Sequence, residues 1–223
     1  VAAAAMIAAI VAVWWCRHRV MRRRRESPPT VLLALWVFGE TRPFMEMLTI
    51  IQRMWRYIGS TQYLWGPGAV TNAPEIFRFL MRGAQPLVVQ SSEDIAREIV
   101  RLGRQPSIWG TYPPPHTLRC SDQSWQEAID RMLLRSDVVL MDLRGFDAED
   151  RGCTYEIGLL IDRVPTHRFV LVVDPSTDYE TLKGLLVEAW GRMSSDSPNR
   201  HPDTWPVRVF RRAPGYAQRP MRS

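Results

Sequence analysis

A short run of apolar residues between two aspartates constrains the fold of this chain more than any other feature. Residues 138–141 read Val-Val-Leu-Met, with Asp137 before them and Asp142 after them. A continuous apolar run of this length is typical of a central strand in a parallel sheet, which is covered on both faces. Asp142 is therefore expected at the carboxyl end of that strand, where ligands bind in open α/β sheets.

Other apolar runs alternate with amphipathic segments along the chain. Strands are predicted at 30–38, 60–65, 138–143, 168–174 and 207–211, the last at an edge, with weaker candidates at 86–90 and 116–120. Helices are predicted at 43–58, 74–81, 92–102, 124–135, 154–164 and 178–190, most with apolar residues at the 3.6-residue period. This alternation predicts an α/β domain with a parallel sheet and helices on both faces.

Two of the predicted helices begin with the pattern of a capping box. Ser124 is followed three residues later by Glu127, and Thr177 by Glu180. In a capping box the first side chain accepts a hydrogen bond from a backbone N–H of the opening turn, and the Glu bonds back. Both Ser124 and Thr177 are therefore expected to cap a helix.

The first 29 residues have the composition of a membrane anchor. Residues 1–16 are apolar and include Trp14-Trp15, and residues 17–29 form a linker with arginines at 17, 19 and 22–25. This pattern predicts that residues 1–16 are the C-terminal part of a transmembrane helix and that residues 17–29 are a basic juxtamembrane linker. An alternative is a buried Ala-rich helix with a solvated basic linker. The adjoining apolar run makes anionic lipid, rather than nucleic acid, the expected partner of the arginines.

The basic linker also predicts the location of the rest of the chain. By the positive-inside rule, residues after the arginines lie in the cytoplasm, so the protein is expected in the cell membrane with a cytoplasmic α/β domain at 30–212. The tail at 213–223 is expected to be disordered.

Composition narrows the chemistry further. The chain has 223 residues, a net charge of +6 and 46% hydrophobic residues, which is enough for one sizeable core. The three cysteines show no CxxC spacing and the four histidines are scattered, so neither a disulfide framework nor a metal site is expected. Dinucleotide-binding GxGxxG, P-loop and GxSxG motifs do not occur.

Four charged residues near predicted strand ends are candidates for chemistry. Glu156 is expected in the opening turn of a helix, where a carboxylate either stabilises an electron-poor sugar carbon or only offsets the helix dipole. Asp142 and Asp174 end strands and are compatible with holding ribose hydroxyls, or with capping turns. Arg144 is a candidate for a phosphate contact, or an exposed loop residue.

Two features beside Glu156 allow a functional or a structural interpretation. The acidic loop of Asp147, Glu149 and Asp150 lacks the glycine and the terminal Glu of a calcium loop, and is expected to be solvated. Cys153, beside the predicted helix start, is either a thiol of lowered pKa or a small packing residue.

The segment from residue 136 to 158 resembles a known superfamily. It reads as an apolar strand, Asp142-Leu-Arg-Gly-Phe146, an acidic loop, and then Gly152-Cys-Thr-Tyr-Glu156-Ile-Gly158. This pattern is similar to the superfamily that joins nucleoside 2-deoxyribosyltransferases and TIR domains. In the transferases the Glu of such a segment is the nucleophile, and in NAD-cleaving TIR domains a Glu of the equivalent helix is catalytic. The resemblance extends from Trp125 to Asp174.

The resemblance implies a flavodoxin-like, TIR-like fold and assigns roles within it. Glu156 and Asp142 are expected to be catalytic. The residues expected to bind substrate are Arg144, Gly145, Phe146, Gly152, Thr154, Tyr155 and Asp174. The chain also resembles a group of uncharacterised bacterial membrane proteins that carry such a domain after membrane helices.

Two function hypotheses follow. The first is a membrane-anchored domain that binds a nucleotide or cleaves an N-glycosidic bond in NAD or a nucleoside, as an NAD nucleosidase or a deoxyribosyltransferase-like hydrolase without a cofactor. The second is a non-catalytic interaction or signalling domain of the TIR type that associates with copies of itself at the membrane. Nucleic acid is expected in neither.

Overall fold

A computed structural model describes residues 30–37, 41–65, 88–101, 116–121, 123–147, 149–201 and 206–211. The predicted membrane helix at 1–16, the basic linker at 17–29, the helix at 74–81 and the tail at 213–223 lie outside these residues. Among the helices that the structure describes, none has both the length and the hydropathy that a membrane span requires.

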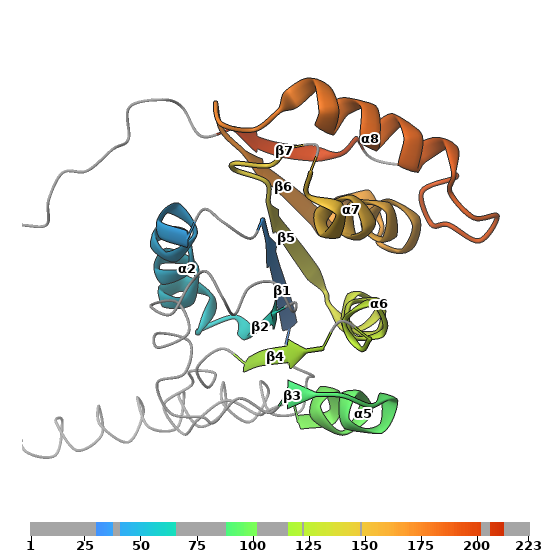
Figure 1. Ribbon diagram of the computed structural model, residues 1–223. Coiled ribbons are helices and arrows are strands. Elements are labelled where there is room, and N and C mark those ends of the chain that lie inside the picture. The colour runs from blue at the N-terminus through green and yellow to red at the C-terminus, as the bar shows by residue number, and fades with distance from the viewer. Residues whose placement is uncertain are drawn as a thin grey trace, which may run out of the picture.

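One parallel sheet forms the centre of the domain (Figure 1). Its strands are β1 (Thr30–Trp36), β2 (Gly59–Trp65), β3 (Val88–Val89), β4 (His116–Cys120), β5 (Val138–Asp142), β6 (Phe169–Val173) and β7 (Arg208–Arg211). The seven strands lie in the order β3-β4-β2-β1-β5-β6-β7, and every neighbouring pair is parallel. The predicted strands are confirmed, including β7 at an edge.

The strand order contains a familiar subset. Strands β2-β1-β5-β6-β7 follow the 2-1-3-4-5 order of flavodoxin-like sheets, and β4 and β3 extend that sheet beyond β2. The segment between β2 and β5 therefore adds strands at one edge and leaves the order of the others unchanged.

Helices cover both faces of the sheet, as predicted. They are α2 (Thr41–Trp55), α5 (Ser92–Arg101), α6 (Trp125–Arg135), α7 (Arg151–Arg163) and α8 (Tyr179–Gly191). The connection from β1 to β2 runs in one direction across the sheet, and the connections that contain α5 to α8 run in the other. Because such crossovers are right-handed, α2 lies on one face and α5 to α8 lie on the opposite face (Figure 1).

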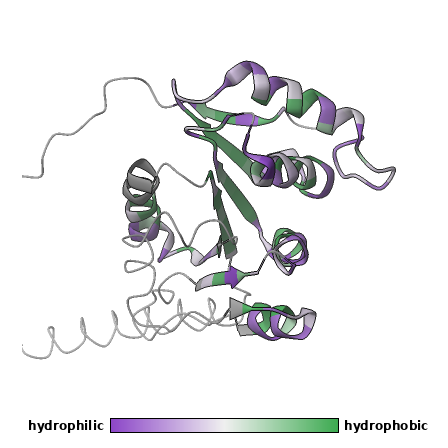
Figure 2. Ribbon diagram, viewed as in Figure 1, coloured by the Kyte–Doolittle hydropathy of each residue, from purple (hydrophilic) through white to green (hydrophobic). Residues whose placement is uncertain are grey.

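The alternation of side chains along each strand produces two apolar clusters. Val139 and Met141 of β5 pack in the larger cluster, with residues of α6 and α7 such as Ile129 and Leu160. The smaller cluster lies on the α2 face and contains Ala34, Trp36, Leu48 and Tyr63. Figure 2 shows the hydrophobic character of the central strands β1 and β5. We refer to the two sides of the sheet as the α2 face and the α6–α7 face.

The capping box predicted at Ser124 does not form. Ser124 makes no side-chain capping bond to α6. Its hydroxyl instead donates to the carbonyl oxygen of Val89, at 2.7 Å. Glu127 accepts a hydrogen bond from the Ser92 hydroxyl of α5, at 2.6 Å. The polar side chains expected to cap the helix therefore connect it to β3 and α5.

The capping box predicted at Thr177 is displaced by one residue. Asp178 caps α8, because its carboxylate accepts a hydrogen bond from the backbone N–H of Thr181, at 3.1 Å. The Thr177 hydroxyl donates to the carbonyl oxygen of Leu143, at 2.8 Å, and so joins the loops that follow β6 and β5. A tertiary contact again replaces the local one that the sequence pattern predicted.

Candidate functional site

The carboxyl ends of β1 and β5 meet at the point where the strand order reverses. The chain leaves β1 towards β2 on one side, whereas β5 flanks β1 on the other. Trp36 and Asp142 are register partners, and the N–H of Val37 donates to the carbonyl oxygen of Asp142, at 3.1 Å. Crevices of this kind are where open α/β sheets bind ligands. The predicted strand-end residue Asp142 is therefore located where the fold places its sites.

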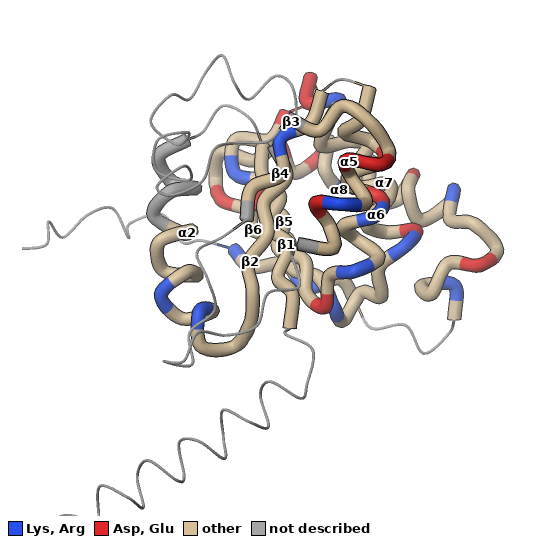
Figure 3. The backbone as a smooth tube through the Cα atoms, turned by 90° about the horizontal axis from the view of Figure 1, so that it is seen from below, with Lys and Arg blue, Asp and Glu red and all other residues tan. Residues whose placement is uncertain are grey.

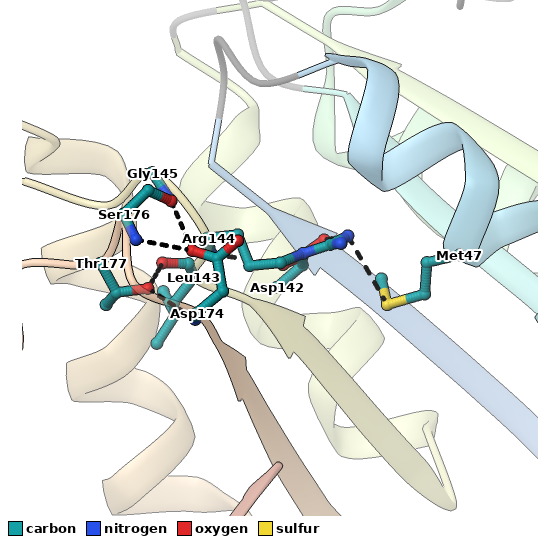
Figure 4. A network of polar contacts seen from close by, with 8 residues as sticks. All are labelled: Met47, Asp142, Leu143, Arg144, Gly145, Asp174, Ser176 and Thr177. Carbon is teal, nitrogen blue, oxygen red and sulfur yellow. Dashed lines mark hydrogen bonds and ion pairs between the residues drawn. The ribbon is translucent and has the colours of Figure 1, made fainter. Parts of the chain in front are cut away.

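Asp142 is engaged in a buried ion pair at this position. Nε of Arg144 lies 2.8 Å from Oδ1 of Asp142, and Nη2 lies 2.5 Å from Oδ2. Both side chains are only 4% exposed. Nη2 of Arg144 also lies 3.9 Å from Sδ of Met47, so the guanidinium extends towards α2 (Figure 4). The two residues predicted to contact ribose and phosphate thus contact each other.

A second network joins the loops that follow β5 and β6. Gly145 has a φ of 75°, a backbone conformation that glycine adopts without strain, and its N–H donates to the Ser176 hydroxyl, at 2.9 Å. Oδ1 of Asp174 accepts hydrogen bonds from both the backbone N–H and the hydroxyl of Ser176 (Figure 4). The Asp174 carboxylate is therefore hydrogen-bonded within its own turn, and the Gly145 N–H is hydrogen-bonded to the loop after β6.

The remaining predicted substrate-binding residues serve packing or local hydrogen bonding. Phe146 is fully buried in the core. The ring of Tyr155, which is 37% exposed, packs against Trp125 of α6 with the ring centroids 5.1 Å apart. The Thr154 hydroxyl donates to the carbonyl oxygen of Asp150 within the first turn of α7. Gly152 faces the Trp125 ring, and a Cβ added there would lie 3.9 Å from it, an ordinary contact.

Glu156 lies deeper in its helix than the sequence pattern indicated. The predicted helix began at residue 154, whereas α7 begins at Arg151, and its first turn contains no acidic residue. The expectation that Glu156 opens the helix is therefore wrong, and a dipole interaction confined to the first turn does not explain its presence. Glu156 belongs to the second turn, where it aligns with the buried residues Cys153, Ile157 and Leu160.

The Glu156 carboxyl has no polar partner in the part of the chain that the structure describes. Its residue is 5% exposed, and no hydrogen bond or ion pair involves it within that part. Burial among apolar neighbours disfavours the charged form and raises the pKa of Glu156 to about 8. The protonated form of the Glu156 carboxyl therefore predominates below about pH 8. An unpartnered buried carboxyl of this kind is a candidate for function.

The two predicted catalytic carboxylates lie on opposite sides of the sheet. Asp142 alternates with Met141, which packs on the α6–α7 face, and its register partner Trp36 belongs to the cluster on the α2 face. Glu156 lies on the buried side of α7. The structure therefore does not bring Asp142 and Glu156 together as a pair.

Cys153 has the opposite character to a reactive cysteine. It is 3% exposed, and burial together with the nearby Glu156 and Asp150 carboxylates raises the pKa of its thiol well above the usual value. Cys153 is therefore a small packing residue. The alternative prediction, a thiol of lowered pKa, is wrong. Among the described residues, no three His, Cys, Asp or Glu side chains gather as a metal ion would require.

The raised pKa of Glu156 makes the stability of the fold depend on pH. Between about pH 4.5 and pH 8 the unfolded chain releases the Glu156 proton and the folded chain retains it, so stability falls as pH rises. Glu156→Gln removes this titration. We expect the variant to match the parent near pH 4.5 and to exceed it by about 3 kcal/mol at pH 7. Urea unfolding at a series of pH values measures the difference.

The matched control for this prediction is Glu180→Gln. Glu180 is an exposed residue in the first turn of α8, so its replacement should change the free energy of unfolding by less than about 1 kcal/mol. Equal pH dependence in the parent and in Glu156→Gln would mean that the carboxyl is solvated rather than buried.

Sequence reasoning missed the contributions of Ser176, Thr177 and Met47 to this region. Ser176 and Thr177 tie the loop after β6 to the loop after β5, and Met47 contacts Arg144 from α2. The sequence Asp174-Pro-Ser-Thr after a buried strand is a turn signal that could have identified the first two. Met47 offered no such signal, because its contact depends on the placement of α2.

No protein-family model matches this chain, and a search of curated proteins finds no relative.

Proposed function

We propose that this domain cleaves the N-glycosidic bond of NAD or a related nucleotide, with Glu156 as its reactive carboxyl. The observation that carries the proposal is the state of Glu156, which is 95% buried and has no polar partner among the described residues. It stands in the helix that follows β5, one of the two strands at the switch point. The resemblance to TIR domains and nucleoside 2-deoxyribosyltransferases, and the flavodoxin-like strand order, support the same assignment.

The chemistry requires one group near the anomeric carbon. As the bond between C1′ and the base nitrogen breaks, its electron pair passes to the base, and positive charge develops on the sugar. An ionised Glu156 stabilises that charge or attacks C1′. Water then adds to C1′, displaces the carboxylate where that has formed a bond to C1′, and loses a proton to the freed carboxylate. For NAD the products are nicotinamide and ADP-ribose, and no cofactor is needed.

The contacts of Asp142 and Arg144 favour positioning roles for both residues. Their ion pair holds the start of the loop after β5 against β5 itself. Because Glu156 is only 5% exposed, a substrate reaches its carboxyl by displacing residues that cover it. We therefore expect the loop between β5 and α7 to move when substrate binds.

The pKa of Glu156 distinguishes between classes of substrate. A pyridinium base, as in NAD, is already cationic and needs the carboxylate form, so kcat/KM should rise with pH to a plateau above about pH 8. A neutral purine leaving group needs a proton from the carboxyl, so kcat/KM should instead fall above that pH. The two pH profiles are opposite in direction, and we expect the rising profile.

Release of nicotinamide by the purified chain, measured from pH 5.5 to pH 9, tests the proposal. Glu156→Gln should lower turnover by about 100-fold or more, because Gln neither ionises nor attacks carbon. Glu180→Gln should retain parental activity. Turnover that survives in Glu156→Gln would refute the assignment of this residue.

The alternative function is that of a non-catalytic interaction domain of the TIR type. It is favoured by the mutual ion pair of Asp142 and Arg144 and by the burial of Phe146, which occupy residues expected to bind substrate. This alternative becomes the better account if the parent releases no base from a panel of nucleotides and no nucleotide raises its melting temperature.

We further propose that the protein is anchored in the cell membrane with this domain on the cytoplasmic side. The apolar run at 1–16 and the arginines between 17 and 25 support the proposal. A flotation assay of the full chain with lipid vesicles tests the anchor independently of any enzymatic activity.

A further inference from the structure

The outward side of α2 and of the turn after it carries large apolar side chains. Ile50, Met54, Tyr57 and Ile58 are 61%, 68%, 53% and 53% exposed. We call these four residues the α2 patch. The helix was predicted to extend to residue 58, but α2 ends at Trp55 and Ile58 lies exposed in the turn that follows. A helix on the surface of a domain normally presents polar residues to water, so the α2 patch indicates a contact with another apolar phase.

The charged residues from the middle of α2 to the turn after it are basic, and the one acid of α2, Glu46, lies one turn before Ile50. Residues 47–58 include Arg53 of α2 and Arg56 of the turn after it, both exposed, and no Asp or Glu. Figure 3 shows blue, basic segments at this end of α2. The Arg56 guanidinium lies 5.3 Å from the centre of the Tyr57 ring. Apolar and aromatic side chains interleaved with arginines match the composition of segments that lie on anionic lipid surfaces.

The position of the α2 patch agrees with such a surface. Its carboxyl-terminal end precedes β2, whose first residue, Gly59, is the register partner of Thr30. The chain reaches Thr30 directly from the proposed anchor at 1–16 and the linker at 17–29. Thirteen linker residues span at most about 45 Å. The carboxyl-terminal end of the α2 patch therefore lies at the edge of the domain where the chain arrives from the proposed membrane helix.

We propose that the α2 patch docks the domain onto an anionic lipid bilayer. Ile50, Met54 and Ile58 enter the boundary between headgroups and acyl chains, Tyr57 lies at the headgroup level, and Arg53 and Arg56 contact lipid phosphates. Asp137 lies at the same edge, where its Oδ2 accepts a hydrogen bond from the N–H of Val31 at 2.8 Å. The bilayer must accommodate this acidic side chain. The proposal rests on the proposed membrane anchor and is independent of the proposed glycosidic-bond cleavage.

The test compares two exposed apolar positions on opposite faces of the sheet. Met54→Cys and Val187→Cys, which replace residues 68% and 67% exposed, are made in the full chain with Cys16→Ser and labelled with an environment-sensitive fluorophore. The native Cys120 and Cys153 are buried and do not compete for the label. Both proteins are reconstituted, at low protein density, into vesicles of phosphatidylcholine with or without phosphatidylserine.

We expect the label at residue 54 to shift to shorter wavelength in vesicles that contain phosphatidylserine, and to be quenched by brominated lipid. The label at residue 187 should remain in water. Arg53→Gln combined with Arg56→Gln should weaken docking about 30-fold, since each Arg near an anionic surface contributes about fivefold. High salt should also weaken docking.

Three outcomes would overturn the docking proposal. In the first, the labels at 54 and 187 respond equally to anionic lipid. In the second, the label at 54 is shielded without anionic lipid and more so at higher protein density, which identifies a second copy of the chain as the occupant. In the third, the full chain does not float with vesicles, and the anchor itself is wrong. In the first two outcomes flotation persists, so failure of docking is distinguished from failure of the anchor.

Discussion

The Val139→Asp variant should fail to fold. Val139 is fully buried in β5, and its register partners Leu33 and Phe169 are also fully buried. An unpaired charge at this position costs several kcal/mol, to which the lost burial of the valine adds about 1.5–3 kcal/mol. The sum is comparable with the roughly 5–15 kcal/mol that stabilise a domain.

Far-UV circular dichroism and urea unfolding measure this effect. The matched control is Val187→Asp, at a position of α8 that is 67% exposed, where the same substitution should change the free energy of unfolding by less than about 0.5 kcal/mol. If Val139→Asp unfolds at the same urea concentration as this control, β5 does not lie at the centre of the sheet.

The Arg144→Met variant should be destabilised by about 3–5 kcal/mol. Removal of the guanidinium leaves the Asp142 carboxylate buried without a counter-charge, at a position where the pair is 4% exposed. The double variant Asp142→Leu with Arg144→Met removes both charges and should recover most of the loss, because apolar replacements of buried pairs are often nearly neutral. Urea unfolding of the parent and of both variants gives the two differences.

An exposed pair supplies the comparison. Nη2 of Arg192, the C-cap residue of α8, lies 2.6 Å from Oε1 of Glu188, and the two side chains are 78% and 47% exposed. Arg192→Gln should therefore cost less than about 1 kcal/mol. A similar small loss in Arg144→Met would show that water reaches Asp142 and that the ion pair does not stabilise the loop after β5.

Local sequence patterns were sufficient to predict the strands and α-helices that the structure describes. The apolar run at 138–141 became β5, and α2, α5, α6, α7 and α8 lie within a few residues of their predicted bounds. The alternation of strands with helices predicted parallel pairing and helices on both faces. Which face each helix covers depended on the strand order, because such crossovers are right-handed. The predicted bounds were not accurate to within one helical turn. Because α7 begins three residues earlier than predicted, Glu156 does not lie in its opening turn.

The sequence by itself thus determined which segments are strands, which are helices and which carboxylates follow strand ends, since those signals repeat over two to four residues. Only the tertiary structure decided that Asp142 and Glu156 lie on opposite faces, that Arg144 binds Asp142, and that Glu156 is buried without a partner. Each of these depends on which elements pack against a side chain from distant parts of the sequence. Desolvation and pairing, which set the pKa of Glu156 and engage the charge of Arg144, arise from that packing and have no local pattern.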